Sequence, residues 1–305
     1  MNPKMTLLCA LVGAAFLAMA GCAHSPAGHE SAGSPAAGQS HFATLGTNRI
    51  HYVVEGAGDH TIVLVHCWAG NLGFWREQVP ALAGKARLIL IDLPGHGQSD
   101  KPHTAYTMDF FAEAVLAVMR DAHVKKATLI GHSMGAPIIC RVYKQAPERV
   151  AALVSVDGML RRPAMTAAQS EQVIGQFRSA DYREKTREFL ATMFPVSGTE
   201  ALRDRIVSEM LETPQYVMLG AMEGMFDQDQ PDWDLHHVDV PVMAINTSNP
   251  MWNDDYKAYV RSLSPQADYR TIDGAGHWLM LEKPGEFNGI LGEMLGKFEL
   301  VQTRP

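Results

Sequence analysis

The 305-residue chain lacks several features that mark common protein classes. No block of Lys and Arg stands out and the formal net charge is −7, so we expect no nucleic-acid partner. It contains neither a Walker-type phosphate loop nor a dinucleotide fingerprint after a strand, so the sequence predicts no cofactor. Its N-terminal apolar run, Thr6–Ala20, is short for a transmembrane helix, which needs ~20 residues. The 47% hydrophobic and 19% charged fractions are typical of a soluble globular protein.

The N-terminus has the layout of an export signal. Met1–Met5 carries one Lys, a small-residue apolar run follows, and the sequence Met-Ala-Gly-Cys ends at Cys22. This order predicts a signal peptide over residues 1–21. The Ala-Gly-Cys ending resembles a bacterial lipobox, which implies lipidation of Cys22 and an anchor in the periplasm or cell envelope. A soluble secreted form is the alternative. Residues 22–40, rich in Ser, Gly, Pro and Ala, predict a flexible tether.

Cysteine is scarce, and only Cys67 and Cys140 would remain to pair in the folded domain once Cys9 leaves with the signal and Cys22 is lipidated. Export permits a disulfide, but a single pair is weak evidence, so we expect two free, buried thiols. The adjacent His236 and His237 point in different directions on most backbones, and we expect no metal site. We expect a monomer or a weak dimer.

Short β-rich runs alternate with longer helical ones, which indicates an α/β fold with a mostly parallel sheet covered by helices on both faces. The core spans 41–157 and 239–305. Residues 158–238 look helical and hold seven of the seventeen Met, which favours a cap, either packed on itself or forming a lid over an apolar pocket. The eight predicted strands are Phe42–Leu45, Arg49–Glu55, Thr61–His66, Arg87–Asp92, Ala127–Gly131, Val150–Val156, Val240–Asn246 and Tyr269–Ile272. The predicted core helices are Phe74–Leu82, Thr107–Ala122, Met134–Gln145 and Glu282–Phe298.

The run GHSMG at residues 131–135 follows a predicted strand and precedes a helix. Glycines permit a sharp turn there that exposes the hydroxyl of Ser133 beside a helix N-terminus, so Ser133 is the predicted nucleophile. Here the chain resembles the α/β-hydrolase family, from about His41 to Phe298. The runs DLPGHGQS at 92–99, GAGH at 274–277 and HCW at 66–68 are similar to the family's other motifs.

The resemblance implies that His277 is the general base, since it lies late in the chain on a Gly-rich loop. The acid is open. The family commonly has an Asp after the seventh strand, where this chain has Asn249 before Pro250. Asp157, which ends the sixth strand, is our preferred acid. Asp254 and Asp255 are alternatives that also fit plain helix N-terminal charge, and a site without a carboxylate is the third option.

The oxyanion hole would use the backbone amides of Trp68 and Met134. Cys67 stands where the family has Gly. If that position requires a positive φ, Cys costs about 1 kcal/mol or more and the loop changes shape; a reactive thiol there is a lesser alternative. We also list four residues around these loops as substrate-binding candidates, although packing around the elbow and the oxyanion loop is the favoured role for the two histidines: His66, Cys67, His132 and Trp278.

Three functions follow. The first is a serine hydrolase that cleaves a carboxylic ester or lactone of a small to medium apolar substrate through an acyl-enzyme. The second keeps the fold but cleaves a C–C bond or performs perhydrolysis. The third is a lipid-tethered binding protein on a disabled scaffold, motivated by Cys67 and by the missing Asp after the seventh strand.

Overall fold

The computed structural model describes residues 38–226 and 229–302. The predicted signal peptide, Cys22 and the tether up to residue 37 lie outside the described residues. The first strand includes Gln39 and Ser40, so the folded part begins two residues earlier than predicted. No helix in the described ranges is long and apolar enough to span a membrane.

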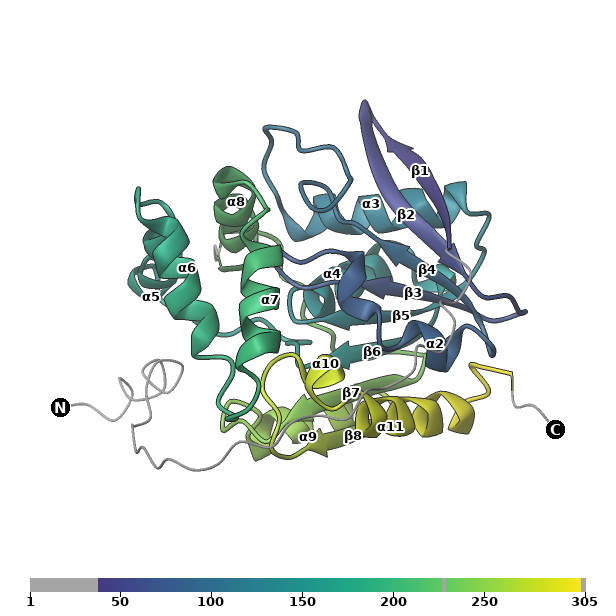
Figure 1. The fold of residues 1–305 in the computed structure, drawn as a ribbon. Coiled ribbons are helices and arrows are strands. Elements are labelled where there is room, and N and C mark those ends of the chain that lie inside the picture. The colour runs from purple at the N-terminus through teal and green to yellow at the C-terminus, as the bar shows by residue number, and fades with distance from the viewer. Residues whose placement is uncertain (1–37, 227–228, 303–305) are drawn as a thin grey trace, which may run out of the picture.

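A single eight-stranded sheet forms the centre, with the order β1-β2-β4-β3-β5-β6-β7-β8 (Figure 1). β1 and β2 form an antiparallel hairpin, β2 is antiparallel to β4, and every other pair is parallel. The inner strands are buried on both faces, which is why their sequences are continuous apolar runs. The strands are β1 Gln39–Leu45, β2 Asn48–Glu55, β3 Thr61–Val65, β4 Arg87–Ile91, β5 Ala127–His132, β6 Val150–Val156, β7 Val242–Thr247 and β8 Ala267–Ile272.

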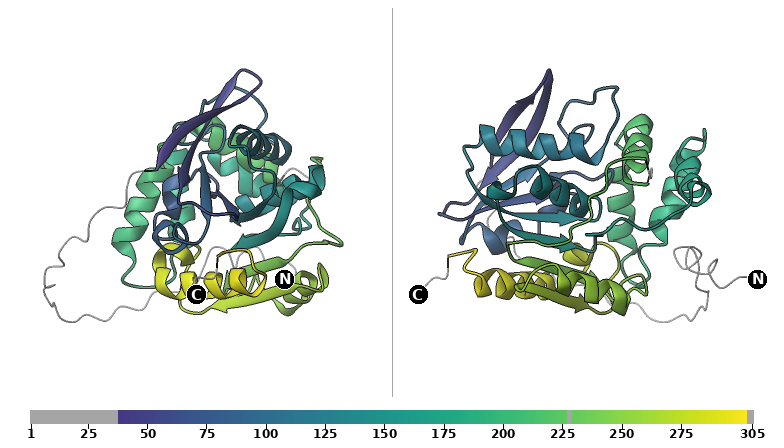
Figure 2. Two further views of the ribbon diagram at one scale, coloured as in Figure 1. Left: turned by 90° about the vertical axis from the view of Figure 1, so that its right-hand side faces the viewer. Right: turned by 180° about the vertical axis from the view of Figure 1, so that it is seen from behind.

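Helices cover both faces of this sheet, with α3 and α4 packed together on one face and α2 and α11 on the other (Figures 1 and 2). The core helices are α2 Val79–Leu82, α3 Met108–Asp121, α4 Gly135–Gln145, α9 Asp254–Ser262, α10 Leu279–Glu282 and α11 Pro284–Lys297, with 3-10 turns at Leu72–Trp75 and Pro147–Arg149.

Two predicted helices differ from the structure because of proline. A helix over Phe74–Leu82 would need a backbone N–H from Pro80, which has none. The chain instead makes a 3-10 turn and then the short α2, with Pro80 in its first turn. Likewise Pro284 is the first residue of α11, two residues after the predicted start, and α10 is a separate turn.

The cap lies between β6 and β7 and gathers beyond one end of the sheet (Figure 1). Each helix is short, and the segment buries aromatic and Met side chains such as Phe177 and Met218. The cap helices are α5 Ala167–Ile174, α6 Tyr182–Ala191, α7 Glu200–Met210 and α8 Gln215–Phe226, with a 3-10 turn at Gly175–Phe177.

Candidate active site

Ser133 occupies a strained turn between β5 and α4. Its φ is +54°, a conformation that costs an L-residue about 1 kcal/mol and is held by the surroundings. Its amide donates to the Val156 carbonyl at 3.0 Å and its carbonyl accepts from the Ala136 amide at 2.9 Å. The turn is tight enough that a Cβ on Gly131 would lie 2.2 Å from the Gly135 oxygen. The predicted nucleophile therefore stands on a sharp strand–turn–helix corner.

His277 follows β8 and is hydrogen-bonded to Asp157, which follows β6. The distance from His277 Nδ1 to Asp157 Oδ2 is 2.6 Å. Asp157 is 5% exposed. Burial opposes its charge, but hydrogen bonding and charge from His277, together with the Thr247 amide, hold the pKa of Asp157 below its ordinary value. An ionised Asp157 only accepts hydrogen bonds, so His277 Nδ1 carries the proton and Nε2 is left to accept one.

The loop after β7 supplies donors to Asp157. The Thr247 amide and hydroxyl donate to Asp157 Oδ1 at 2.9 and 3.0 Å, and the Trp252 indole donates at 2.9 Å. One carboxylate oxygen thus receives three donors while the other faces His277. The place where the family commonly keeps its acid holds groups that orient an acid from the neighbouring strand. Asp254 and Asp255 are elsewhere, in the first turn of α9, which Asn253 caps.

Sequence reasoning missed a second carboxylate near His277. Glu282 accepts from the Gly276 amide at 2.8 Å and from the Trp278 amide at 3.3 Å. These bonds clamp the loop on both sides of His277. The only signal in the sequence was the presence of an acidic residue, Glu282, five positions after His277.

His132 and His66 bond to the backbone of the loops that carry His277 and Cys67. His132 Nε2 donates to the His277 carbonyl at 2.8 Å, and its ring lies 4.8 Å from the His277 ring. His66 accepts from the Leu93 amide at Nε2 (3.0 Å), so its Nδ1 donates to the Cys67 carbonyl at 2.7 Å. Burial lowers the pKa of both imidazoles, that of His132 to about 3, so both are neutral near pH 7. These contacts fit the positioning role that the sequence favoured for the two histidines.

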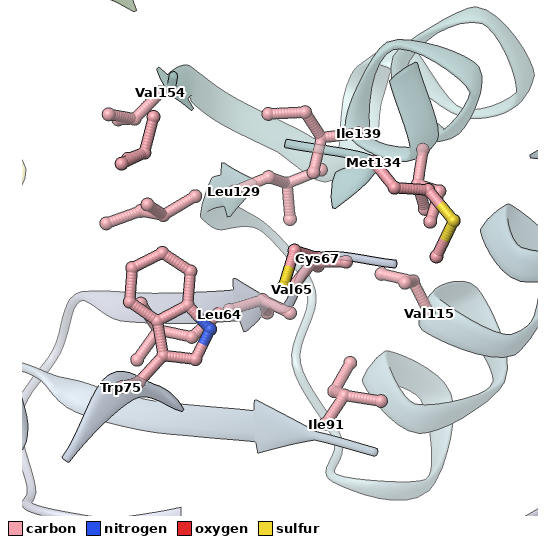
Figure 3. Packing of buried hydrophobic residues seen from close by; sticks show 14 of the residues in the cluster. Leu64, Val65, Cys67, Trp75, Ile91, Val115, Leu129, Met134, Ile139 and Val154 are labelled. Atoms are coloured by element: carbon pink, nitrogen blue, oxygen red, sulfur yellow. The ribbon is translucent and has the colours of Figure 1, made fainter. Parts of the chain in front are cut away.

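Cys67 does not have a positive φ, so the strain considered for this position does not arise. The positive φ falls on Ala69, at +53°, two residues later. Figure 3 shows Cys67 and Met134 among buried apolar side chains, and burial raises the pKa of the Cys67 thiol to about 12, which opposes reactivity. Cys67 and Cys140 are free, as predicted.

The backbone amides of Trp68 and Met134 donate to no acceptor within the described chain. Met134 precedes α4, whose N-terminus adds a favourable field for an anion. The Ser133 hydroxyl and His277 Nε2 make no hydrogen bond with each other in the described ranges. Such contacts are often loose before substrate binds. The four candidates His66, Cys67, His132 and Trp278 are each at most 2% exposed.

The cap contacts both catalytic loops. The Trp68 indole donates to the Met218 carbonyl in α8 at 2.8 Å and its ring packs on Phe177 and Phe189. On the other side, the His277 amide donates to the Met193 carbonyl at 3.0 Å. Trp278 stacks on Phe194 of the cap at 4.6 Å. Within the described chain, no group of three or more His, Cys, Asp or Glu side chains is placed to hold a metal ion.

The chain has the α/β-hydrolase fold. Residues 60–192 match the model of the family described as the alpha/beta hydrolase fold. The esterase from Thermogutta terrifontis has a similar structure (TM-score 0.75, 22% identity, 85% of this chain and 99% of that one).

Two curated relatives are similar in sequence. The acetyltransferase component of the acetoin cleaving system of Cupriavidus necator is 25% identical over 86% of this chain and 70% of its own length. The 2-hydroxy-6-oxononadienedioate/2-hydroxy-6-oxononatrienedioate hydrolase of Paraburkholderia phymatum is 26% identical over 82% and 91%. The chain is thus similar to proteins with different named activities, and its own activity rests on the site.

Proposed function

We propose that this protein is a serine hydrolase that cleaves carboxylic esters or lactones through an acyl-enzyme. The observation that carries the proposal is the 2.6 Å contact between His277 Nδ1 and the buried Asp157, on a sheet whose neighbouring strand presents Ser133 at a strained turn. Nucleophile, acid and base then occur in the chain order Ser, Asp, His, which is that of α/β-hydrolases.

In this mechanism Ser133 Oγ attacks the carbonyl carbon while His277 Nε2 takes its proton. The amides of Trp68 and Met134 hold the oxyanion, which in related chemistry is the largest single contribution. His277 then protonates the leaving alkoxide, and water releases the acyl group by the same steps in reverse order. Asp157 keeps the proton on Nδ1 and stabilises the imidazolium.

The aromatic contacts between the cap and the oxyanion loop support a small to medium apolar acyl or aryl group as substrate. Trp68, Phe177 and Phe189 form a cluster with ring centroids 5.0–6.1 Å apart. These rings make the surroundings of the Trp68 amide apolar, and burial of hydrocarbon in apolar surroundings is favoured by about 25 cal/mol per Å². A C–C bond hydrolase is the second candidate, because a relative that the chain covers to 91% is named as a hydrolase of 2-hydroxy-6-oxo dienedioates.

A panel of p-nitrophenyl esters of increasing chain length, lactones and a 2-hydroxy-6-oxo dienedioate tests the proposal on the purified full chain. We expect ester or lactone turnover, reduced at least about 10³-fold by Ser133→Ala, since the oxyanion hole and binding alone leave a residual rate. Turnover of the dienedioate alone would support the second candidate. Ligand binding without turnover of any of these would contradict both.

The cellular location of the enzyme is part of the proposal. Export and lipidation at Cys22 would put the enzyme in the periplasm or on the cell envelope. Cys22→Ser should move the protein from the membrane fraction to the soluble fraction. An unchanged distribution would contradict lipidation without touching the hydrolase assignment.

A further inference from the structure

A Ser–His–Asp chain of hydrogen bonds lies at the edge of the sheet, outside the site above. Ser40 Oγ is 2.8 Å from His51 Nε2, and His51 Nδ1 is 2.8 Å from Asp92 Oδ2. Ser40 belongs to β1, His51 to β2 and Asp92 follows β4. The order of atoms matches that expected of a hydroxyl, its base and the acid that orients the base.

The strand register explains the contact. Phe42 pairs with His51 and Ser40 with Val53, so Ser40 and His51 are diagonal neighbours on one face of the hairpin. Ser40 is exposed, whereas His51 is 1% and Asp92 2% exposed. The base is therefore shielded, while the serine that it contacts belongs to an exposed position of the strand.

The other hydrogen bonds of Asp92 determine where the protons lie between Ser40, His51 and Asp92. Asp92 also accepts from the Leu72 amide at 2.8 Å and from the Gln98 amide at 2.9 Å. Burial opposes its charge, but these bonds and the one from His51 hold the pKa of Asp92 below its ordinary value. The ionised carboxylate accepts a proton from His51 Nδ1, which fixes the tautomer in which Nε2 accepts the proton of the Ser40 hydroxyl.

We propose that Ser40 is a second acyl-accepting serine of this protein, activated by His51 and Asp92 and reactive toward activated aryl esters and fluorophosphonates. With an ester, Oγ bonds to the carbonyl carbon and the bond to the aryl oxygen breaks. The phenolate leaves with the electron pair and takes up the hydroxyl proton through His51. With a fluorophosphonate, the P–F bond breaks and fluoride leaves.

An apolar group flanks the serine. The exposed Phe42 ring lies 5.1 Å from the His51 ring and offers a surface for an aryl leaving group. Ser40 stands within a strand, whereas Ser133 precedes a helix N-terminus. The loss of one oxyanion donor costs about 10²–10³ in rate, so Ser40 should react slower than Ser133 by at least about that factor.

Fluorophosphonate labelling of the full chain, read by intact mass and peptide mapping, tests this. In the Ser133→Ala protein we expect one adduct, on Ser40. In the natural protein we expect two, with the one on Ser40 forming slowly. Ser133→Ala with Ser40→Ala should carry none. Because each adduct is read in its own peptide, failure of the proposed hydrolase and failure of this proposal are separate results.

A matched control is available on the same face of the same strand. Thr44 is exposed and its hydroxyl bonds to no described histidine. Thr44→Ser, added to the Ser133→Ala and Ser40→Ala changes, presents a serine without a base and should stay unlabelled. His51→Gln should also abolish the Ser40 adduct, with its fold checked by circular dichroism. An unlabelled Ser133→Ala protein, or equal labelling of the Thr44→Ser variant, would overturn the proposal.

Discussion

At the scale of single residues, the Asp157 carboxylate divides its two oxygens between two tasks. Oδ2 faces His277 at 2.6 Å, while Oδ1 receives the Thr247 and Trp252 donors. The donors from β7 and its loop fix the carboxylate plane without competing for the oxygen that His277 uses. A buried carboxylate with four partners is well satisfied and holds its charge.

Replacing Asp157 by Asn should lower kcat by about 10⁴, because an amide no longer dictates the tautomer of His277 nor stabilises its charge. Steady-state ester hydrolysis measures this. The double change Asp254→Asn with Asp255→Asn is the control and should leave kcat near that of the natural protein, since Asp254 is fully exposed at the start of α9. Loss in the double variant with retention in Asp157→Asn would reverse the assignment.

The sequence predicted that Ser133, Asp157 and His277 follow β5, β6 and β8, whose carboxyl ends lie at the same edge of the parallel sheet. It could not indicate that Thr247 and Trp252 bond Asp157, because those contacts join residues 90 and 95 positions apart. It also assigned possible strain to Cys67, whereas the turn places it at Ala69. The motifs therefore predicted which loops carry the site residues. The residue types did not indicate the backbone path within each loop.

At the scale of elements, the corner between β5 and α4 depends on close backbone approach. A Cβ on Gly135 would lie 2.5 Å from the Val65 oxygen and one on Gly158 would lie 2.5 Å from the Ala136 Cβ. Three segments that carry site residues therefore approach closely because Gly135 and Gly158 have no side chains. Their sequences predicted the strands within about two residues, since buried parallel strands are continuous apolar runs. The short cap helices gave no such pattern: α8 is apolar on nearly all sides.

Gly131→Ala should destabilise the fold by about 1–3 kcal/mol or more and reduce activity, because the new Cβ would sit 2.2 Å from the Gly135 oxygen. Urea denaturation and ester hydrolysis measure the two effects. Gly289→Ala in α11, where an added Cβ meets nothing within 4 Å, is the control and should stabilise by up to about 1 kcal/mol. Equal effects of the two changes would refute this account of the corner.

Trp68→Phe should loosen the cap, because it removes the hydrogen bond to Met218 while retaining the Trp68 backbone amide position. We expect faster hydrogen exchange in α8 and a weaker preference for one ester chain length. Trp75→Phe is the matched control, since the buried Trp75 indole N–H has no partner among described residues. The same exchange in both variants would argue against Trp68 as the link between oxyanion loop and cap.

At the scale of the whole molecule, several histidines are buried and are neutral near pH 7. Burial is the main cause that lowers the pKa of His96 and of His132 to about 3, and it also lowers that of His66. His66 and His132 bond to loops 27 and 145 positions away in the sequence, whereas His96 donates to the Pro94 carbonyl within its own loop. In the unfolded chain these histidines have their ordinary pKa of 6.5, so below that pH the unfolded chain binds protons that the folded chain does not bind.

The free energy of unfolding should therefore fall as the pH falls from about 6.5 toward 3, by up to about 1.4 kcal/mol per pH unit for each such histidine. Below about pH 4 the lowered pKa values of Asp92 and Asp157 add loss of the same sign. Urea titrations at pH 7.5, 6 and 5 measure the slope, and His96→Gln should reduce it. Stability that is flat across this range would show that these imidazoles are charged in the folded state.

The most direct test of the hydrolase assignment is to identify the residue that a fluorophosphonate modifies first. We predict that the first, rapid adduct forms on Ser133 in step with loss of ester hydrolysis, and that this adduct is absent from Ser133→Ala. A natural protein that hydrolyses esters but whose first adduct maps outside the peptide containing Ser133, or that loses no activity when Ser133 is modified, would contradict the account.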